Sequence, residues 1–528
     1  MRRLWTNGII ASMDPYMRSY EALGAEDGKI VFLGTAAQAA EQPWDETTDL
    51  GGKLMLPGFM DTHMHMLHYA LFKRNLPLFG VKSIEDIVSM GRARVEAERP
   101  AYLLGMGWNQ ETLAENRLVT RDDMDRISTD IPVCMLRVCG HVAACNSKML
   151  EIISGQRDLD PETLSHVDFI HGILREDAMR LYMNVIPRMD AAFVRSLIDQ
   201  GQADLNACGI TCVHSDDLKV IPGMDPYDLI NLFRTVEREG RLTVRVYEQC
   251  LVDQSAFAPM HGCRDSLDNH ESLFRTGPRK LLQDGSLGAK SALMIHGYYD
   301  EPLNHGIPIY TPGELYRWIK AAHDDHMNVA VHAIGDMAIS QVCDAVERVQ
   351  AENPWPEARH GVVHAQITNP ELLRRMERLR LQAYIQPVFI EADMDVIEER
   401  VGPTYMKGTY NWKTMLELGI PCSGGSDCPV ESFSILENLY AAVTRKNRAG
   451  TKTFLPEQAL TMEEGVRLFT TGAAWASYDE DWRGSLELGK LADLAVLDRD
   501  IFHMDPDELL HTRVAETVLN GKTVFKAR

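Results

Sequence analysis

Four histidines and one aspartate lie in or directly after short apolar segments, and residues of these types bind metal ions. His63 and His65 end the segment KLMLPGFMDTHMH as His-Met-His. Alternate residues of a strand share one face, so both imidazoles can point at a single ion. His332 lies in NVAVHAIGD, His364 in HGVVHAQ, and Asp427 ends IPCSGGSD. Taken singly, each histidine is more simply a hydrogen-bonded structural residue, and the aspartate could equally be a helix cap.

The elements that must position these residues alternate between strands and helices. Short apolar runs predict eight strands, at 53–65, 209–214, 242–250, 279–285, 328–336, 360–366, 381–387 and 420–427. Helical periodicity appears at 191–207, 226–239, 312–326, 337–352, 369–380 and 411–418. Eight units of this kind predict an α/β fold, a closed parallel (β/α)₈ or TIM barrel.

In such a barrel, the candidate residues fall at the carboxyl ends of the first, fifth, sixth and eighth strands. Those ends converge on one point, where the active sites of TIM barrels are built. Imidazoles and a carboxylate gathered there form a nitrogen–oxygen site that suits Zn²⁺ or a similar divalent ion. We therefore expect a divalent metal cofactor, most simply zinc, with one or two ions per chain.

The rest of the chain predicts two further parts. A long stretch separates the first two strands, so we expect an inserted subdomain at 70–190 that covers the barrel mouth. Both chain ends carry hairpin turn signals, Asn7-Gly8, Asp27-Gly28 and Asn520-Gly521. They predict one β-domain formed by 1–56 and 486–528, beside a barrel of 57–485.

Composition narrows the choice of partners and location. The chain of 528 residues has 54 Lys+Arg against 76 Asp+Glu, a net charge of −22. Such a chain repels phosphate backbones and anionic lipid, so we expect a small-molecule substrate and neither nucleic acid nor membrane as partner. We expect neither a signal peptide nor a membrane-spanning segment, because no apolar run of the required kind follows the N-terminal arginines or occurs elsewhere in the sequence. Its ten cysteines are scattered without a CxxC pair, which indicates free buried thiols and a cytoplasmic location.

Several segments resemble the amidohydrolase superfamily, and specifically its amidohydrolase-3 branch of YtcJ-like proteins. The resemblance runs almost from end to end and rests on LPGFMDTHMH, RKLLQDGSLGAKSAL, VAVHAIGD, RHGVVHAQ, GGSDCPV and GKLADLAVLD. Within the insertion it rests on GWNQETLAENR, VCGHVAACNS and GILREDAM. It implies a (β/α)₈ barrel joined to a composite β-sandwich that is built from both termini.

The resemblance also implies roles for individual residues. His63 and His65 would hold the more buried metal ion, and His332 and His364 the more exposed one. Asp427 would bind metal and serve as the proton shuttle.

Lys280, on the fourth strand, falls where many superfamily members carry a carboxylated lysine that bridges two metal ions. A carbamate supplies two anionic oxygens, whereas an ammonium would be repelled by the cations. The alternatives are a solvated lysine or one paired with Asp284. Some members of the wider branch use a cysteine near the second strand instead, so Cys212 is a minor candidate ligand.

The expected reaction is hydrolysis of an amide-like C–N bond by metal-activated hydroxide, with Asp427 passing the proton to the leaving nitrogen. Expected substrates are N-acyl amines, N-acyl amino acids or N-substituted formamides. One alternative is a deaminase or cyclic-amide hydrolase acting on a heterocycle. A metal-free scaffold of the same fold is disfavoured because all six ligand positions are filled.

Three residues of the insertion are candidates for substrate binding. His141 would hydrogen-bond the substrate carbonyl or its oxyanion, Trp108 would form a pocket wall, and Arg175 would anchor an anion. The structural alternatives are a satisfied histidine, a core tryptophan, and an arginine that pairs with Glu176. The sequence leaves open the substrate, the native metal and the oligomeric state, a homo-oligomer included.

Overall fold

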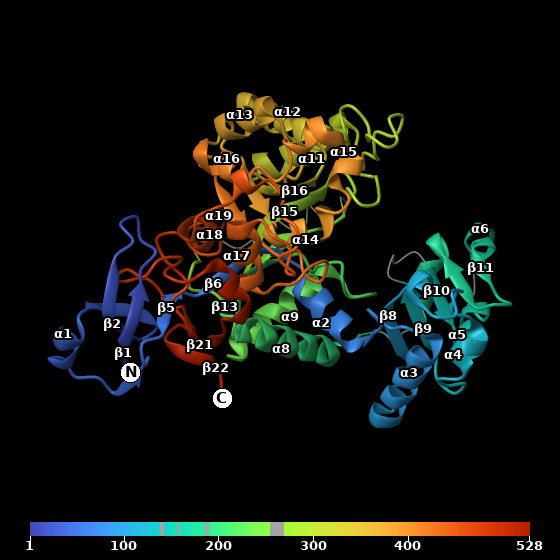
Figure 1. Cartoon of the computed structure of the whole chain (residues 1–528), viewed down its shortest axis with the longest axis horizontal. Helices are drawn as coiled ribbons and strands as arrows, with labels where there is room; N and C mark the ends of the chain where they lie inside the picture. The colour runs from blue at the N-terminus through green and yellow to red at the C-terminus, as the bar shows by residue number, and fades with distance from the viewer. Residues whose placement is uncertain (138–141, 157–158, 184, 186–188, 254–268) are drawn as a thin grey trace. The chain divides into compact units, whose positions relative to one another are not determined.

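The computed structural model of the chain contains the predicted parallel barrel (Figure 1). It describes residues 1–137, 142–156, 159–183, 185, 189–253 and 269–528. The barrel strands pair in parallel, in the order β6 (Phe59–Met64), β13 (Ile210–Ser215), β14 (Arg245–Cys250), β15 (Phe274–Leu282), β16 (Val329–Ala333), β17 (Gly361–His364), β18 (Gln382–Ile385) and β19 (Cys422–Gly424). The predicted fold class is thereby confirmed.

The first and last strands approach each other closely enough to close the barrel almost completely. The Thr62 hydroxyl on β6 donates to the carbonyl of Gly424 on β19 at 2.9 Å. Beyond the strand ends, the Asp427 N–H donates to the His63 carbonyl at 2.7 Å and the His65 N–H to the Cys428 carbonyl at 2.8 Å. This seam joins the two segments that carry His63, His65 and Asp427.

Helices alternate with the barrel strands where periodicity predicts them: α8 (Ala191–Ala207), α9 (Pro226–Arg238), α11 (Pro312–Asp324), α12 (Asp336–Glu352), α13 (Pro370–Arg378) and α16 (Trp412–Glu417). Three of them begin with a capping side chain followed by proline. Asp225, Thr311 and Asn369 each accept a backbone N–H of the first helical turn. Proline suits the first helical position because no N–H is needed there. Three further helices, α17 (Ile435–Thr444), α18 (Met462–Leu468) and α19 (Thr471–Ala476), follow β19.

Strands from both chain ends pair in a second, eight-stranded sheet (Figure 1, blue and red). Its strands are β1 (Arg2–Ala11), β2 (Ser19–Glu26), β3 (Lys29–Gly34), β4 (Glu46–Asp49), β5 (Leu54–Pro57), β20 (Leu494–Leu497), β21 (Val514–Leu519) and β22 (Lys522–Lys526). The halves meet where β5 pairs antiparallel with β20. Side chains from both halves share one hydrophobic cluster that includes Trp5, Leu23, Met55, Leu494 and Val518.

The turn signals at the chain ends have two outcomes. Asp27-Gly28 and Asn520-Gly521 have positive φ at both positions and connect hairpins, as predicted. Asn7-Gly8 lies inside β1 instead, so its prediction as a hairpin turn is wrong. Asn7 has φ 57°, and the register of β1 shifts between Thr6 and Ile10. This irregularity lets β1 pair with β4 through its first half and with β5 through its second.

The chain divides into two compact units. The barrel and the terminal sheet belong to one unit, Met1–His68, Arg195–Val220 and Met224–Arg528. Because the predicted boundaries of the β-domain run inside this unit, that division stays a prediction. The other unit comprises Tyr69–Val194 and Ile221–Gly223.

The smaller unit has a six-stranded sheet, in the order β11 (Val167–Asp168), β12 (Ile173–Arg175), β10 (Val142–Cys145), β9 (Val133–Arg137), β8 (Leu103–Trp108) and β7 (Leu76–Pro77). Its helices include α3 (Ile84–Glu98), α4 (Arg121–Asp125) and α5 (Ser147–Ser154). The unit has a hydrophobic core of its own, which includes Ile87, Trp108 and Met135. None of the helices in the described residues is long and apolar enough to span a membrane.

A buried ion pair connects the barrel to the terminal sheet. The Arg245 guanidinium on β14 donates to the Asp493 carboxylate at 2.8 Å, and both side chains are almost fully buried. Arg245 also donates to the Asn520 side chain. The pair therefore joins a barrel strand to the segment that precedes β20.

Arg245→Ala should destabilise the protein by about 3–5 kcal/mol, because the Asp493 carboxylate would stay buried without its partner. The urea midpoint measures the change. Lys452→Ala is the control, since its partner Asp395 and Lys452 itself are both more than half exposed, and such pairs contribute only about 0–1 kcal/mol. Equal shifts for the two variants would contradict the stabilising role of the buried pair.

Candidate metal centre

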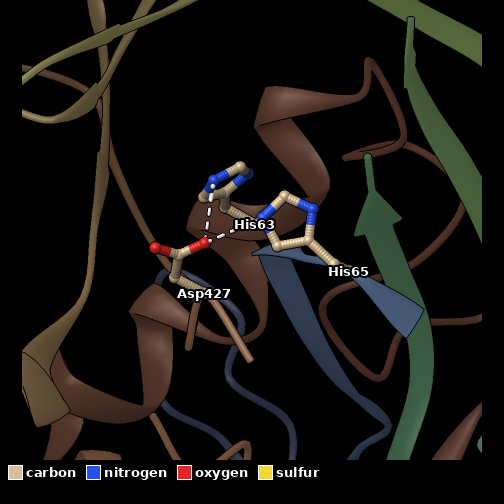
Figure 2. A group of neighbouring side chains, drawn as sticks. All are labelled: His63, His65 and Asp427. Carbon is tan, nitrogen blue, oxygen red and sulfur yellow. Dashed lines mark hydrogen bonds and ion pairs between the residues drawn. The ribbon is translucent and has the colours of Figure 1, made fainter. Parts of the chain in front are cut away.

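One histidine of the first barrel strand and one that directly follows it face the carboxylate that comes after the last barrel strand. Asp427 Oδ1 lies 3.3 Å from His63 Nε2 and 3.1 Å from His65 Nε2. Figure 2 shows both imidazoles turned toward this one oxygen. One possible ligand atom from each residue lies within 4.8 Å of the others. The three side chains therefore have the types and spacing of a metal site.

The other predicted ligands lie against this group. Lys280 Nζ is 3.1 Å from His63 Nε2, and the rings of His63 and His364 are 5.6 Å apart. His364 Nε2 lies 2.9 Å from His332 Nδ1. The structure thus brings all six predicted ligands, Asp427 and His65 included, into one cluster at the carboxyl ends of the barrel strands.

Main-chain carbonyls determine which nitrogen two of the histidines present. His65 Nδ1 donates to the Asp216 carbonyl at 2.8 Å, and His332 Nε2 donates to the Gly285 carbonyl at 3.2 Å. A neutral imidazole has one N–H, so the lone pair lies on the other nitrogen. When neutral, His65 therefore presents the lone pair of Nε2 to Asp427, and His332 presents that of Nδ1 to His364.

This arrangement tests whether the residues fit a metal ion. In neutral His65, the lone pair of Nε2 would face a carboxylate oxygen, so two acceptors would lie 3.1 Å apart with no proton between them. Such a contact is favourable only when a cation or an added proton lies there. Imidazole nitrogens and a carboxylate oxygen are the donors that zinc and similar divalent ions prefer. The donor set fits a divalent metal.

Burial keeps most of the imidazoles neutral. Burial and the nearby Lys280 amine lower the pKa of His63 to about 3 and that of His332 to about 4. Burial, with His332 beside it, also holds the pKa of His364 well below its ordinary value. Burial lowers the pKa of Lys280 too, although Asp216 and Asp427 oppose the shift.

His65 and Asp427 behave as a charged pair. Burial acts to lower the pKa of His65, but the hydrogen bond and the charge of Asp427 outweigh it and raise that pKa to about 9. Burial acts to raise the pKa of Asp427, but contacts with His63 and His65 hold it well below its ordinary value. The carboxylate therefore stays ionised, and it attracts a positive charge to the position between the three side chains.

The backbone around Asp427 is held by a buried aspartate of β6. Asp61 Oδ1 accepts the N–H groups of His63 and Ser426, both at 3.1 Å.

Two of the predicted ligands have unusual backbone angles. Asp427 itself has φ 56°, and His364 has φ 78°. Both values lie in the left-handed region that is uncommon for residues with a Cβ atom. Two of the six predicted ligands thus have strained backbone, which is typical of functional sites.

Comparison with known proteins agrees with this geometry. The model of the amidohydrolase family matches residues 46–525. The chain belongs to this family. YtcJ of Bacillus subtilis is 30% identical over 543 residues, with all of both chains covered. These two matches confirm the resemblance to the YtcJ-like branch.

Two further relatives of this amidohydrolase bear on its chemistry. The structure of a metal-dependent hydrolase from Pyrococcus furiosus has a TM-score of 0.79 and 28% identity, covering 95% of this chain and 100% of that chain. An N-substituted formamide deformylase of Arthrobacter pascens is 24% identical over 545 residues, covering 98% of this chain and 96% of the relative. This amidohydrolase is a metal-dependent hydrolase of non-peptide C–N bonds.

In the amidohydrolase, the surroundings of Lys280 differ from those expected if Lys280 paired with Asp284. Asp284 accepts backbone N–H groups from Leu293, Ile334 and Gly335. Lys280 Nζ lies 3.8 Å from the carboxylate of Asp216 instead. Cys212, the minor alternative ligand, packs in a hydrophobic cluster with Met60, Ala473 and Ala474.

Asp216 is a site residue that sequence reasoning missed, although a signal for it exists. It directly follows β13, at the carboxyl end where the metal ligands of the other strands lie. Gln249 and Gln386 occupy similar positions at the ends of β14 and β18, and each contacts a site histidine. Strand-end position alone would have selected all three.

Two of the three substrate-binding candidates of the amidohydrolase, Trp108 and Arg175, lie in its smaller unit. Trp108 is fully buried in the core of that unit, and its indole N–H donates to the Met135 carbonyl at 2.8 Å. Arg175 is exposed on β12. His141 lies outside the described residues. Their roles in substrate binding stay predictions.

Gly425 permits the close approach of the two segments that form the metal centre. A Cβ atom at this position would lie 2.6 Å from His63 N and 3.0 Å from His63 O. Gly425→Ala should therefore push the Asp427 segment away from β6, lowering zinc content after reconstitution and the free energy of unfolding by about 1–3 kcal/mol. Gly288→Ala is the control, because nothing lies within 4 Å of its Cβ. The expectation fails if both variants match the wild type in zinc content and urea midpoint.

Proposed function

We propose that this amidohydrolase cleaves the C–N bond of an N-acyl amine, an N-acyl amino acid or an N-substituted formamide, with zinc as its metal. The observation that carries the proposal is the convergence of the Nε2 atoms of His63 and His65 on the ionised Asp427 carboxylate. Zinc is among the divalent ions that match such a nitrogen–oxygen donor set. The formamide deformylase relative supports the substrate class.

The residues that would hold the metal are His63, His65, Lys280, His332, His364 and Asp427. When bound, a divalent ion would polarise the substrate carbonyl and lower the pKa of water to about 7. The chain's own contribution is to hold these donors in place. The seam between β6 and the Asp427 segment fixes the first of them, and the Asp216 and Gly285 carbonyls orient His65 and His332.

Asp427 would move the proton. Its Oδ1 faces two imidazoles, and the hydrogen bond from its own N–H to the His63 carbonyl fixes its backbone. We propose that the carboxylate takes a proton from the attacking water and gives it to the leaving nitrogen. The amine product then departs neutral, and the acyl part is released as the carboxylic acid or formic acid, which gives its remaining proton to solvent and becomes a carboxylate or formate.

We also propose that Lys280 is carboxylated. Its side chain is almost fully buried beside His63. The neutral amine would add to CO₂ and lose one proton, giving a carbamate whose anionic oxygens suit a pair of cations.

A cytoplasmic location fits the eight free cysteines of the described residues.

A substrate screen with the zinc-reconstituted chain tests the proposal. N-acyl amines, N-acyl amino acids and N-substituted formamides should release carboxylate or formate together with amine. Aminated heterocycles and cyclic ureas form the contrasting set, monitored by ammonia release and ring opening. Turnover confined to the contrasting set would replace the proposal with the deaminase or cyclic-amide alternative.

Asp427→Asn should lower kcat by about 10²–10⁴-fold per bound zinc, because the amide cannot accept the proton. Zinc is measured by elemental analysis for each preparation, so that a loss of metal is separated from a loss of proton transfer. Asp395→Asn, an exposed aspartate, should leave kcat unchanged. A full kcat per zinc in Asp427→Asn would assign the proton transfer to another group.

Lys280→Ala should lower the metal content from about two ions per chain toward one and remove most of the activity. Without the anionic bridge, two cations about 4 Å apart repel each other strongly in a partly dry site. Short carboxylic acids should partly restore the variant, and low bicarbonate during reconstitution should slow activation of the wild type. Lys320→Ala on α11 is the control, because Lys320 is only partly buried and pairs with Asp324 and Glu352. An unmodified Lys280 beside one fully occupied ion would make the enzyme mononuclear, with Asp427 still the proton shuttle.

A further inference from the structure

Two buried glutamines contact the two most buried site histidines in the same way. Gln249 Oε1 lies 2.8 Å from His63 Nδ1, and Gln386 Oε1 lies 2.8 Å from His364 Nδ1. Both glutamines are almost fully buried. Gln249 is the last residue but one of β14 and Gln386 directly follows β18, and these two strands supply no predicted metal ligand.

A second hydrogen bond fixes the orientation of each amide. Gln249 Nε2 donates to the Thr62 carbonyl at 3.0 Å, and Gln386 Nε2 donates to the Tyr384 carbonyl at 3.0 Å. Because each NH₂ group is directed to a main-chain carbonyl, the amide oxygen must face the imidazole. An amide oxygen only accepts hydrogen bonds, so the proton of each ring lies on Nδ1.

We propose that Gln249 and Gln386 are positioning residues that hold His63 and His364 in the Nδ1–H tautomer. Both Nε2 lone pairs are then directed into the metal centre, toward Lys280, Asp427 and His332. Partners of this kind orient metal ligands, and their loss typically lowers metal affinity by about 10–100-fold. The proposal rests on the metal site of the proposed function, but it concerns the state of the histidines before any metal binds.

The two glutamines differ from the partners of the other site histidines. His65 and His332 are oriented by main-chain carbonyls, which no substitution removes. The glutamines orient their rings through side chains, so the effect can be deleted one histidine at a time. Gln382 supplies a matched control. It is fully buried on β18, donates to the Ser423 hydroxyl at 2.7 Å, and no hydrogen bond joins it to a site histidine.

The first experiment records ¹⁵N spectra of the full-length, metal-free chain labelled at histidine. Loss of a signal in His63→Asn or His364→Asn assigns each ring. In the wild type, both rings should show a protonated Nδ1 and an unprotonated Nε2. Gln249→Met should produce mixed tautomers at His63 only, and Gln386→Met at His364 only. Unchanged tautomers in both variants would overturn the proposal.

The second experiment measures Zn²⁺ affinity by competition with a chelator, after circular dichroism shows that each variant is folded. Gln249→Met and Gln386→Met should each bind Zn²⁺ about 10–100-fold more weakly than the wild type. Gln382→Met should bind like the wild type. If all three variants lose affinity equally, the glutamines only fill space, and the positioning role is rejected.

Gln249→Glu and Gln386→Glu keep an acceptor oxygen opposite Nδ1 and guard against a Met variant that fails to fold. They should retain the Nδ1–H tautomer and most of the Zn²⁺ affinity. A Glu variant that loses both contradicts the proposal. Failure of the wild type to bind Zn²⁺ would remove the proposed function, while the metal-free spectra would still decide the role of the glutamines.

Discussion

At the carboxyl end of the barrel, nitrogen and oxygen atoms of the candidate ligands face one another in close pairs. These pairs impose the constraint on which the rest of the structure depends. His65 Nε2 faces Asp427 Oδ1 at 3.1 Å, and His332 Nδ1 faces His364 Nε2 at 2.9 Å. Buried acceptors this close stay together only if a cation or a proton joins them and if the chain prevents the rings from turning. The hydrogen bonds to the outer nitrogens supply that restraint, since each holds its ring in one orientation.

The terminal sheet takes part in the same restraint, although it carries no candidate ligand. β5 belongs to that sheet, and β6, which begins two residues later, supplies His63 and His65. The Gly58 N–H between them donates to the Asp493 carbonyl at 2.8 Å. Asp493 in turn accepts the buried Arg245 of β14. A shift of the terminal sheet would therefore be transmitted directly to the strand that begins the metal centre.

The ligand positions could be predicted from sequence because each depends on one local rule. A histidine or an aspartate at the end of a short apolar run lies at the barrel mouth once the run is a barrel strand, as His63 and Asp427 show. The outcome of Asn7-Gly8 shows the limit of such rules. The dipeptide favours positive φ, which serves a hairpin turn and a strand irregularity equally well. Pairing with β4 and β5 decides between them, and these partners lie far along the chain.

The orienting groups could not be predicted from their residue types. Glutamine as a residue type does not indicate a metal site, and a main-chain carbonyl has no sequence signature at all. Gln249 and Gln382 are the same residue type; strand-end position separates them, but the contact of Gln249 with His63 is a matter of three-dimensional packing. The carboxylate of Asp216 likewise gains meaning only from the approach of Lys280, which comes from a strand two places away in the barrel.

The pairing of β5 with β20 has a consequence for the synthesis of the chain. Leu494 follows Pro57 by 437 residues, so at ~5–20 residues per second β5 waits on the order of 20–90 s for its partner to leave the ribosome. During that time its edge is an open template for pairing with other chains. A ribosome that stalls before β20 releases a chain with both the β5 edge and the core around Trp5 and Met55 uncovered. The topology itself thus leaves a strand edge and part of a hydrophobic core uncovered until translation is nearly complete, before any chemistry at the metal centre.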